Sequence, residues 1–332
     1  MTPSAIITTC LIGGRSVHRT GGGPAVSWLP PSAIEDFAAQ NHKAVRFLNR
    51  GSIVTATLID AALRQRWPDR DARPPELALL TGTGFGNQGE TTRYFRLIRE
   101  RGVTGVNPMQ SLDVAVNSFA NVATVFFGVT GIVHTMSSGA ASGADTLASA
   151  LCLLDAGETE AVVAADCEYE SEEVYSYTGA IESASPGGAE ACGVLVLERT
   201  RTDGKACGVL LGAETAYANP GTKRAPQVLA ALVARLLLSR QLEPSAISAV
   251  FAGPPWTGVS ALARDVLSLP RASWLDGAAA TTPWQVGAMG TVGCALILDH
   301  LHQSEPGGVG LVVTGDPGGW FGAVLLAADE TR

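Results

Sequence analysis

Short apolar runs alternate along the chain with longer segments in which apolar residues recur at every third or fourth position. Such runs are typical of strands buried on both faces, and the longer spacing is typical of amphipathic helices. We expect strands at residues 5–12, 77–81, 132–136, 161–165, 192–197, 208–214, 247–252, 310–314 and 323–327. We expect helices at residues 44–64, 90–101, 114–127, 141–156, 226–240, 260–269 and 293–302. Strands that alternate with helices in this way predict an α/β architecture with sheets covered on both faces.

The length of 332 residues allows one large or two modest domains with a sizeable core. The alternation of strands and helices divides roughly near residues 200–205. We therefore predict an N-terminal half, residues 1–200, and a C-terminal half, residues 201–332, within one compact unit. No internal sequence repeat links the two halves.

The charge balance narrows the classes of partner. Lys and Arg total 23 against 31 acidic residues, for a net charge of −8, and no long basic run is present. Nucleic acid and acidic membrane surfaces are therefore poor partners. Residues 114–144 carry no charged side chain, but their many polar and turn-forming residues favour buried protein over a membrane span. The first residues lack the pattern of a signal peptide, so we expect a cytoplasmic protein.

Six cysteines are scattered through apolar surroundings, without a CxxC pair or a Cys/His cluster. This pattern favours buried, reduced thiols and no metal site. Gly84, Gly86 and Gly89 form a GxGxxG pattern between a predicted strand and a predicted helix, which is the setting of a dinucleotide-binding turn. The acidic residue that would bind the ribose is missing near Met109. The pattern therefore favours a tight turn, and we expect no cofactor.

A cluster of hydroxyl groups and one imidazole lies at a predicted strand-to-helix junction. His134, Ser137 and Ser138 fall where the N-terminus of a helix would point its free N–H groups, which is a setting that can activate a serine. The GxSxG motif is absent, and serines are also common in turns and N-caps. Both interpretations stay open at this point.

Several motifs, in order, resemble those of the β-ketoacyl synthases. Residues 135–146, T-M-S-S-G-A-A-S-G-A-D-T, resemble the family's nucleophile turn, T-x-S-T-x-C-T-S-G-x-D-x. Residues 79–86 resemble its VGTGxG turn, residues 107–131 its dimer-interface segment, and residues 316–323 its F-G-F-G-G-x-N loop. The resemblance covers most of the chain. It implies a thiolase-like, layered α-β-α-β-α fold of two similar halves.

The departures from the family pattern fall on its catalytic residues. Family members hold the acyl chain on a cysteine thiolate and use two histidines, with a nearby lysine, to decarboxylate the extender unit. The alignment places Ala140 at the cysteine, Gly253 and Ala288 at the histidines, and Pro283 at the lysine. A shifted alignment would bring Met136, Ser137 or Ser138 to the nucleophile position, but no shift supplies the histidines. The resemblance therefore implies a vestigial site and a chain that does not condense acyl groups by itself.

A ketosynthase fold without its catalytic set resembles the chain-length factor, the ketosynthase-like subunit of type II polyketide synthases. This resemblance implies a pseudoenzyme that forms a heterodimer with an active ketosynthase, to which acyl carrier protein delivers acyl and malonyl groups. It also implies that four residues of the interface segment meet or line the partner's acyl tunnel and set polyketide chain length: Met109, Gln110, Val114 and Asn117. Three tryptophans in Gly/Pro-rich loops are candidates to plug the vestigial pocket: Trp256, Trp284 and Trp320. Familiar chain-length factors carry Gln at the cysteine position and are longer, so a divergent class, such as a reducing or polyene-making system, fits better.

Two other hypotheses stay open. The chain could be an acyltransferase or hydrolase on the same fold that uses Ser137 or Ser138 with His134. It could also be a homodimeric acyl-binding scaffold that needs no partner ketosynthase.

Overall fold

The computed structural model describes residues 4–13, 26–169, 190–199, 206–220, 222–253, 258–275 and 287–329. Its strands are β1 (Ala5–Gly13), β2 (Ser27–Leu29), β3 (Ala78–Gly82), β4 (Val133–Met136), β5 (Ala161–Tyr169), β6 (Glu190–Glu198), β7 (Gly208–Tyr217), β8 (Ile247–Gly253), β9 (Ser273–Leu275), β10 (Val309–Gly315) and β11 (Trp320–Ala328). Its α-helices are α1 (Pro31–Gln40), α2 (His42–Val45), α3 (Arg50–Arg66), α4 (Gln88–Arg101), α5 (Ser118–Phe127), α6 (Ser142–Ala156), α8 (Ala225–Ser239), α9 (Val259–Val266) and α11 (Met289–Ser304). Short 3₁₀ turns include η2 (Val103–Gly105), η3 (Pro108–Asp113) and η4 (Gly139–Ala141).

The strands follow one order twice. In the N-terminal half the order is β4-β3-β5-β6-β1, and in the C-terminal half it is β9-β8-β10-β11-β7. In each half the first two pairings are parallel and the next two are antiparallel. The two halves join where the first residues of β1 pair with the first residues of β7. The fold therefore consists of two similar halves, as the sequence predicts, whereas the domain boundary at residues 200/201 stays a prediction.

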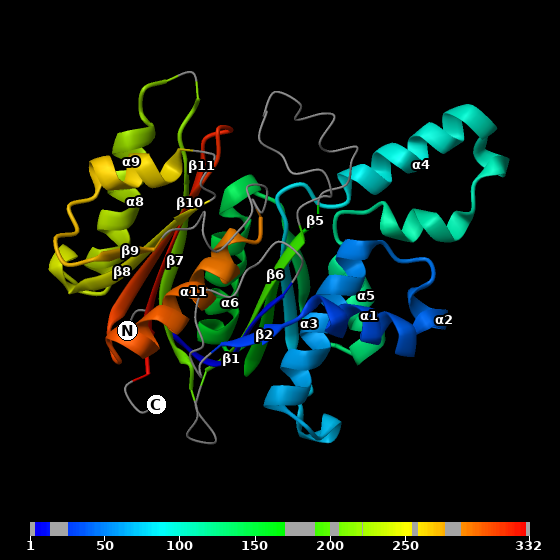
Figure 1. The fold of residues 1–332 in the computed structure, drawn as a ribbon, viewed down its shortest axis with the longest axis horizontal. Helices are drawn as coiled ribbons and strands as arrows, with labels where there is room; N and C mark the ends of the chain where they lie inside the picture. Colours follow the sequence, from blue (N-terminus) through cyan, green and yellow to red (C-terminus); the bar gives the residue numbers. More distant parts are fainter. Residues whose placement is uncertain are drawn as a thin grey trace.

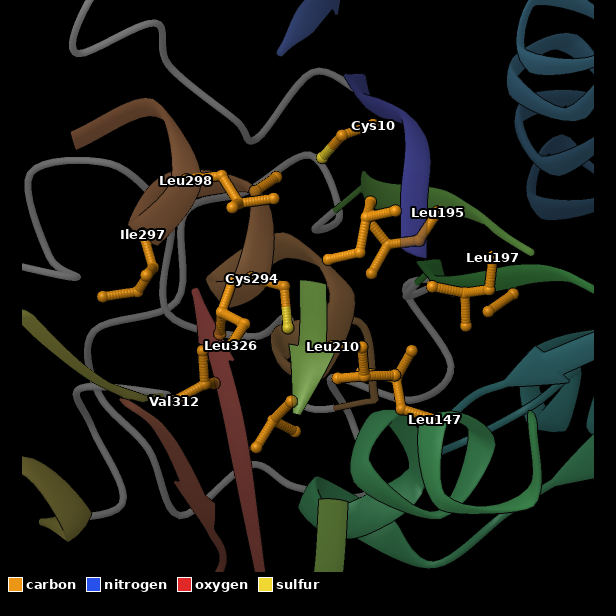
Figure 2. Packing of buried hydrophobic residues seen from close by; sticks show 14 of the residues in the cluster. Cys10, Leu147, Leu195, Leu197, Leu210, Cys294, Ile297, Leu298, Val312 and Leu326 are labelled. Atoms are coloured by element: carbon orange, nitrogen blue, oxygen red, sulfur yellow. The ribbon is translucent and has the colours of Figure 1, made fainter. Parts of the chain in front are cut away.

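Two helices form the central layer of the molecule (Figure 1). Both α6 and α11 contact strands of both halves, so each packs between the two parts of the sheet. Apolar residues of α6 and α11 meet buried side chains of β1, β6, β7, β10 and β11 in one continuous cluster, part of which is shown in Figure 2. Because these strands are covered on both faces, their sequences are continuous apolar runs.

Two further apolar clusters lie on the outer faces. In the N-terminal half, α3 and α5 cover β3, β5 and β6, and in the C-terminal half, α8 and α9 cover β8, β10 and β11. The result is the layered α-β-α-β-α arrangement that the sequence predicts. Among the described residues no helix is long and apolar enough to cross a membrane.

Two predicted helices begin later than expected. The helix expected at 44–64 divides into α2 and α3, because the side chain of Asn49 caps α3 by accepting a hydrogen bond from the amide of Ser52 at 2.7 Å. The helix expected at 114–127 begins only at Ser118, after the 3₁₀ turn η3. The sequence analysis also missed α1, β2 and β9. The two strands have only three residues each, too few for a period to show.

All six cysteines are free thiols, and five of them are buried. Burial raises the pKa of Cys10, Cys192 and Cys294 above the ordinary value, which favours the protonated thiol. The expectation of buried thiols is wrong for Cys152, which is exposed near the end of α6, where residues 155–157 are exposed as well.

Candidate functional site

The structure describes three of the four positions that the sequence analysis predicts to be vestigial, and they lie at the ends of central elements. Ala140 belongs to η4, directly before α6, and Ala288 is the residue before α11. Gly253 ends β8. All three are buried, and Ala140 and Ala288 have no exposed surface. Pro283, the fourth vestigial position, lies outside the described residues, as do Trp256 and Trp284.

Glycines bring the first turns of the two central helices together. Gly143 is the second residue of α6 and Gly290 the second residue of α11. A Cβ at either glycine would lie 2.6 Å from the Cα of the other, so no larger residue fits at this crossing. The turns that precede α6 and α11 therefore lie close to one another, at the same end of the two helices.

The turn before α6 is held by a serine hydroxyl. Ser142 Oγ accepts a hydrogen bond from the amide of Ser138 at 2.9 Å and lies 2.7 Å from the carbonyl of Gly139 and 2.9 Å from that of Thr83. Gly139 adopts the left-handed conformation, with φ of 56°. The amide of Ala140 donates to Oδ2 of Asp316 at 2.8 Å. This turn is thus fixed by contacts from both halves.

A buried carboxylate fixes the turn before α11 in the same manner. Glu168, on β5, accepts hydrogen bonds from the amides of Gly84 at 2.7 Å, Phe85 at 3.2 Å and Gly287 at 2.8 Å. The hydroxyl of Thr83 adds a fourth donor at 3.3 Å. Burial raises the pKa of Glu168 to about 7, although these hydrogen bonds act in the opposite direction.

The same contacts decide between two interpretations of the GxGxxG segment. The amides of Gly84 and Phe85, which a bound phosphate would need, donate to Glu168, and the amide of Gly86 donates to the hydroxyl of Thr83 at 2.9 Å. A carboxylate at this position repels a phosphate. The segment is therefore the tight strand-to-helix turn that the sequence favours.

A second buried carboxyl group, that of Asp166, lies deeper between the halves. It faces the hydroxyls of Thr146 on α6 and Thr291 on α11, neither of them in full hydrogen-bond geometry. Complete burial raises the pKa of Asp166 to about 7. Its side chain is fully buried, and a Cβ at Gly82 would collide with one of its oxygens while a Cβ at Gly143 would lie 2.8 Å from the other, so both glycines make room for it.

The serines and the histidine do not form a catalytic pair. Ser138 Oγ donates to a carboxylate oxygen of Asp145, and the other oxygen of Asp145 accepts from Thr215 Oγ1 at 2.8 Å. Ser137 and His134 are exposed. No hydrogen bond described for this part of the chain joins His134 to either serine. The imidazole base that a serine nucleophile needs is not in place.

Trp320 is the one predicted plug residue that the structure describes. Its ring packs against Tyr217, with ring centroids 5.2 Å apart, and stays 38% exposed. One of its ring carbons lies 3.8 Å from the position that a Cβ at Gly139 would take. Trp320 therefore covers the turn that carries Ala140 from the side of the C-terminal half. Beside it, the loop of Asp316 lines a cleft of about 240 Å³ together with α8 and α9.

The predicted interface segment lies on the N-terminal half, where the carbonyls of Val114 and Ala115 accept hydrogen bonds from Thr91 and Asn87 near the start of α4. Met109 and Asn117 are exposed, whereas Gln110 and Val114 are half-buried. The segment is anchored by Asp113, whose carboxylate accepts hydrogen bonds from the amide of Asn49 and, at 3.1 Å, from Ser52 Oγ. Burial raises the pKa of Asp113 to about 6. The anchor fixes the base of the segment while its outer side chains face solvent.

Six of the nine exposed large apolar side chains among the described residues belong to the segment between β3 and β4: Phe95, Val103, Met109, Leu112, Val116 and Val125. In this segment α4 packs chiefly against η2 and η3 and projects from the body of the molecule (Figure 1). Exposed large apolar side chains gathered on one segment are typical of protein–protein interfaces. Within the described ranges, no group of three or more His, Cys, Asp and Glu residues could hold a metal ion.

Comparison with known proteins assigns the family. The family model of the β-ketoacyl synthase N-terminal domain matches residues 37–203, which is half of the chain. The chain belongs to the β-ketoacyl synthase family. No curated protein sequence matches it closely enough to count as a relative.

Solved β-ketoacyl synthase structures share the fold across nearly the whole chain. "The ishigamide ketosynthase/chain length factor" matches with a TM-score of 0.74 and 17% identity, over 89% of this chain and 85% of that one. A type II polyketide synthase acyl-carrier protein in complex with its ketosynthase, AntDE:AntF, matches at 0.73 and 15% identity, over 99% and 100%. A β-ketoacyl synthase from Burkholderia phymatum STM815 matches at 0.72 and 15% identity, over 99% and 100%. Identities this low establish the fold alone.

Sequence reasoning missed the two carboxylates that hold the turns before α6 and α11. Glu168 lies beyond the predicted strand 161–165, and Asp316 was noted only as part of a loop motif. One signal was available, because each acid lies within a few residues of the end of a continuous apolar run, Glu168 near the end of β5 and Asp316 directly after β10. Which amides each carboxylate meets depends on residues far apart in the chain.

Proposed function

We propose that this chain is a non-catalytic ketosynthase-like subunit, a chain-length factor, that pairs with an active β-ketoacyl synthase and shapes the acyl tunnel of the pair. One observation carries the proposal. The positions that align with the family's cysteine and histidines hold Ala140, Gly253 and Ala288, all buried. None of these side chains can form a thioester or transfer a proton. The partner would supply that chemistry.

The apolar surface between β3 and β4 supports a permanent partner. An isolated soluble protein rarely exposes so many large apolar side chains on one segment, and obligate interfaces are rich in them. In addition, β4 ends the strand order and pairs, among the described strands, only with β3. A free strand edge beside apolar side chains is a surface that a second chain can cover.

Two structural neighbours match this proposal. One is named as a ketosynthase/chain length factor, and another holds an acyl-carrier protein together with its ketosynthase. We propose by analogy that an acyl carrier protein delivers acyl and malonyl groups to the pair that this chain forms. The proposed class is a reducing or polyene-making system, and the mass of the product would distinguish it from one that makes unreduced chains.

The pairing is tested by co-expression with the nearest ketosynthase encoded in the same genome, with a tag on this chain only, followed by native mass spectrometry. We expect a one-to-one complex. A stable homodimer that ignores the ketosynthase would contradict the proposal and favour an acyl-binding scaffold. Incubation of the chain alone with acyl thioesters checks the enzyme alternative. A covalent adduct that either Ser137→Ala or Ser138→Ala abolishes would support a serine nucleophile.

The tunnel role is tested with larger side chains on the interface segment. Val114 and Gln110 are half-buried, so a Trp at either position fills space at the proposed junction with the partner. We expect Val114→Trp and Gln110→Trp to shorten the product by whole extender units, as read from product mass. Leu238→Trp, on the exposed face of α8, is the matched control and leaves product length unchanged. Unchanged products from both interface variants would rule out the tunnel role.

A further inference from the structure

The backbone amide of Ala140 donates its hydrogen bond to a carboxylate of the same chain, that of Asp316. Asp316 lies in the loop between β10 and β11, and its Oδ2 accepts the Ala140 N–H at 2.8 Å. Its Oδ1 accepts the amide of Trp320 at 3.3 Å. The loop is closed by two backbone hydrogen bonds, from Asp316 to the carbonyl of Trp320 at 3.1 Å and from Gly319 to the carbonyl of Asp316 at 3.0 Å. The carboxylate is therefore held from both sides.

The conformation of the turn before α6 leaves space for the carboxylate of Asp316. A Cβ at Gly139 would collide with Asp316 Oδ2, and the left-handed φ of Gly139 also disfavours any larger residue. The amide of Ala140 lies at the start of η4 and α6, where backbone N–H groups favour a negative charge. An acyl group carried on residue 140 would direct its carbonyl oxygen to such an amide. Here that amide is already bonded.

The opposite half contains the same contact. On β5, Glu168 lies two residues beyond Asp166, which pairs with Gly193, and on β10, Asp316 lies two residues beyond Thr314, which pairs with Gly322. Glu168 binds the amide two residues before α11, that of Gly287, at 2.8 Å. Asp316 binds the amide two residues before α6, at the same distance. In each half, a carboxylate at the end of the equivalent strand thus accepts a hydrogen bond from the equivalent turn of the other half.

We propose that Asp316 is an internal anion that closes the acyl position at residue 140 and makes that turn a structural brace, the counterpart of the brace at Glu168. The inference deepens the proposed function, since it takes residue 140 as the vestigial acyl position. It explains why the missing cysteine is not the only obstacle to acylation. A cysteine thiolate at position 140 would need the backbone amide of the turn to stabilise its charge. That amide is bonded to Asp316, and the negative carboxylate disfavours ionisation of the thiol.

The test places a cysteine at the site with and without the carboxylate. Ala140→Cys, Ala140→Cys/Asp316→Asn and Ala140→Cys/Asp316→Gly are made in the full chain carrying Cys152→Ser, because Cys152 is exposed and would react. The pH dependence of alkylation by iodoacetamide, read by intact mass, gives the midpoint of thiol ionisation separately from its access. Asp145 and Asp166 remain in every variant, so a difference reports on position 316. Thermal melting confirms that each variant folds.

We expect the thiol introduced by Ala140→Cys to be alkylated at least tenfold faster at pH 7 without the carboxylate, with its midpoint moved to lower pH. Acetate, added at constant ionic strength, should slow alkylation of the Asp316→Gly variant by refilling the amide, whereas chloride should not. Equal midpoints with and without Asp316 would overturn the proposal. The Asp316→Asn variant keeps the loop if the glycine variant does not fold. None of these measurements depends on the partner, so the result holds even if the proposed pairing fails. If only the complex can be purified, the mass spectrum still reports the alkylation of each chain separately.

Discussion

The N-terminal and C-terminal halves share their strand order, and each has a carboxylate that accepts a hydrogen bond from a turn of the other half. Their outer surfaces differ. Between β3 and β4 the chain runs over residues 83–132 and forms α4, η2, η3 and α5. The equivalent connection between β8 and β9 covers residues 254–272, and its described part forms only α9. Among the described residues, the longer connection carries all of the exposed large apolar side chains of the N-terminal half. The two halves therefore share the strands and carboxylates that hold the candidate site, and they differ in the surface that we propose a partner covers.

The largest expected effect is a difference in stability between variants of the two carboxylates. Glu168 is buried and accepts three amides and a hydroxyl, whereas Asp316 is half-buried and accepts two amides. Glu168→Ala should lower the free energy of unfolding by about 3–5 kcal/mol, and Asp316→Ala by about 1–2 kcal/mol, because buried donors lose their acceptor. Urea denaturation measures both. Glu168→Gln, which keeps one acceptor oxygen, should fall between them, and equal losses at the two sites would contradict the contrast between the halves.

The next prediction concerns the surface that distinguishes the halves. Leu112→Asp and Val116→Asp place a charge on the apolar segment between β3 and β4, and we expect each to weaken binding to the ketosynthase about 100-fold, or by about 3 kcal/mol. Leu238→Asp, on α8 of the C-terminal half, should bind as the unmodified chain does. The dissociation constant, measured by titration of purified subunits, decides the point. Equal weakening by all three variants would indicate a different interface.

A pH effect should arise from the N-terminal half. At the end of β5 the pKa values of Asp166 and Glu168 are raised to about 7, whereas the residue of β10 equivalent to Asp166 is Thr314. Between about pH 4 and pH 7 the folded chain therefore binds more protons than the unfolded one, and each group lowers the free energy of unfolding by at most about 1.4 kcal/mol per pH unit as pH rises. Asp113, with a pKa raised to about 6, acts in the same direction.

Denaturation at a series of pH values tests this, with Asp166→Asn as the variant. The loss of stability should level off above pH 7, and Asp166→Asn should make the curve shallower. A free energy of unfolding that rises across this window would contradict the sign. An unchanged slope in the variant would show that Asp166 does not carry the effect.

The smallest effect concerns the aromatic pair on the C-terminal half. Trp320 and Tyr217 lie with their rings 5.2 Å apart at an angle of 55°. A double-mutant cycle of Trp320→Ala and Tyr217→Ala should give a coupling energy of about 1 kcal/mol in urea denaturation. A coupling near zero would mean that Trp320 covers the turn of Ala140 without being held there by Tyr217.

Much of the fold could be predicted from the sequence, because the information is local. Continuous apolar runs marked β3, β5, β6, β10 and β11 within a few residues, since strands buried on both faces show no polar alternation. The resemblance of the motifs also identified the family. The start of α5 was misplaced because the residues before it include the 3₁₀ turn η3, whose last residue, Asp113, is bonded to the distant Asn49.

Residue type and order along the chain were enough to establish the alternating elements, the family, and the lack of reactive side chains at Ala140, Gly253 and Ala288. Three-dimensional packing was needed to show that Asp316 binds the amide of Ala140, that Glu168 binds that of Gly287, and that the connection between β3 and β4 leaves its apolar side chains exposed. The two hydrogen bonds join residues more than one hundred positions apart. The exposure of the apolar side chains depends on which parts of the folded chain leave that segment uncovered. No local pattern records such relations, because they arise only when distant parts of the chain pack together.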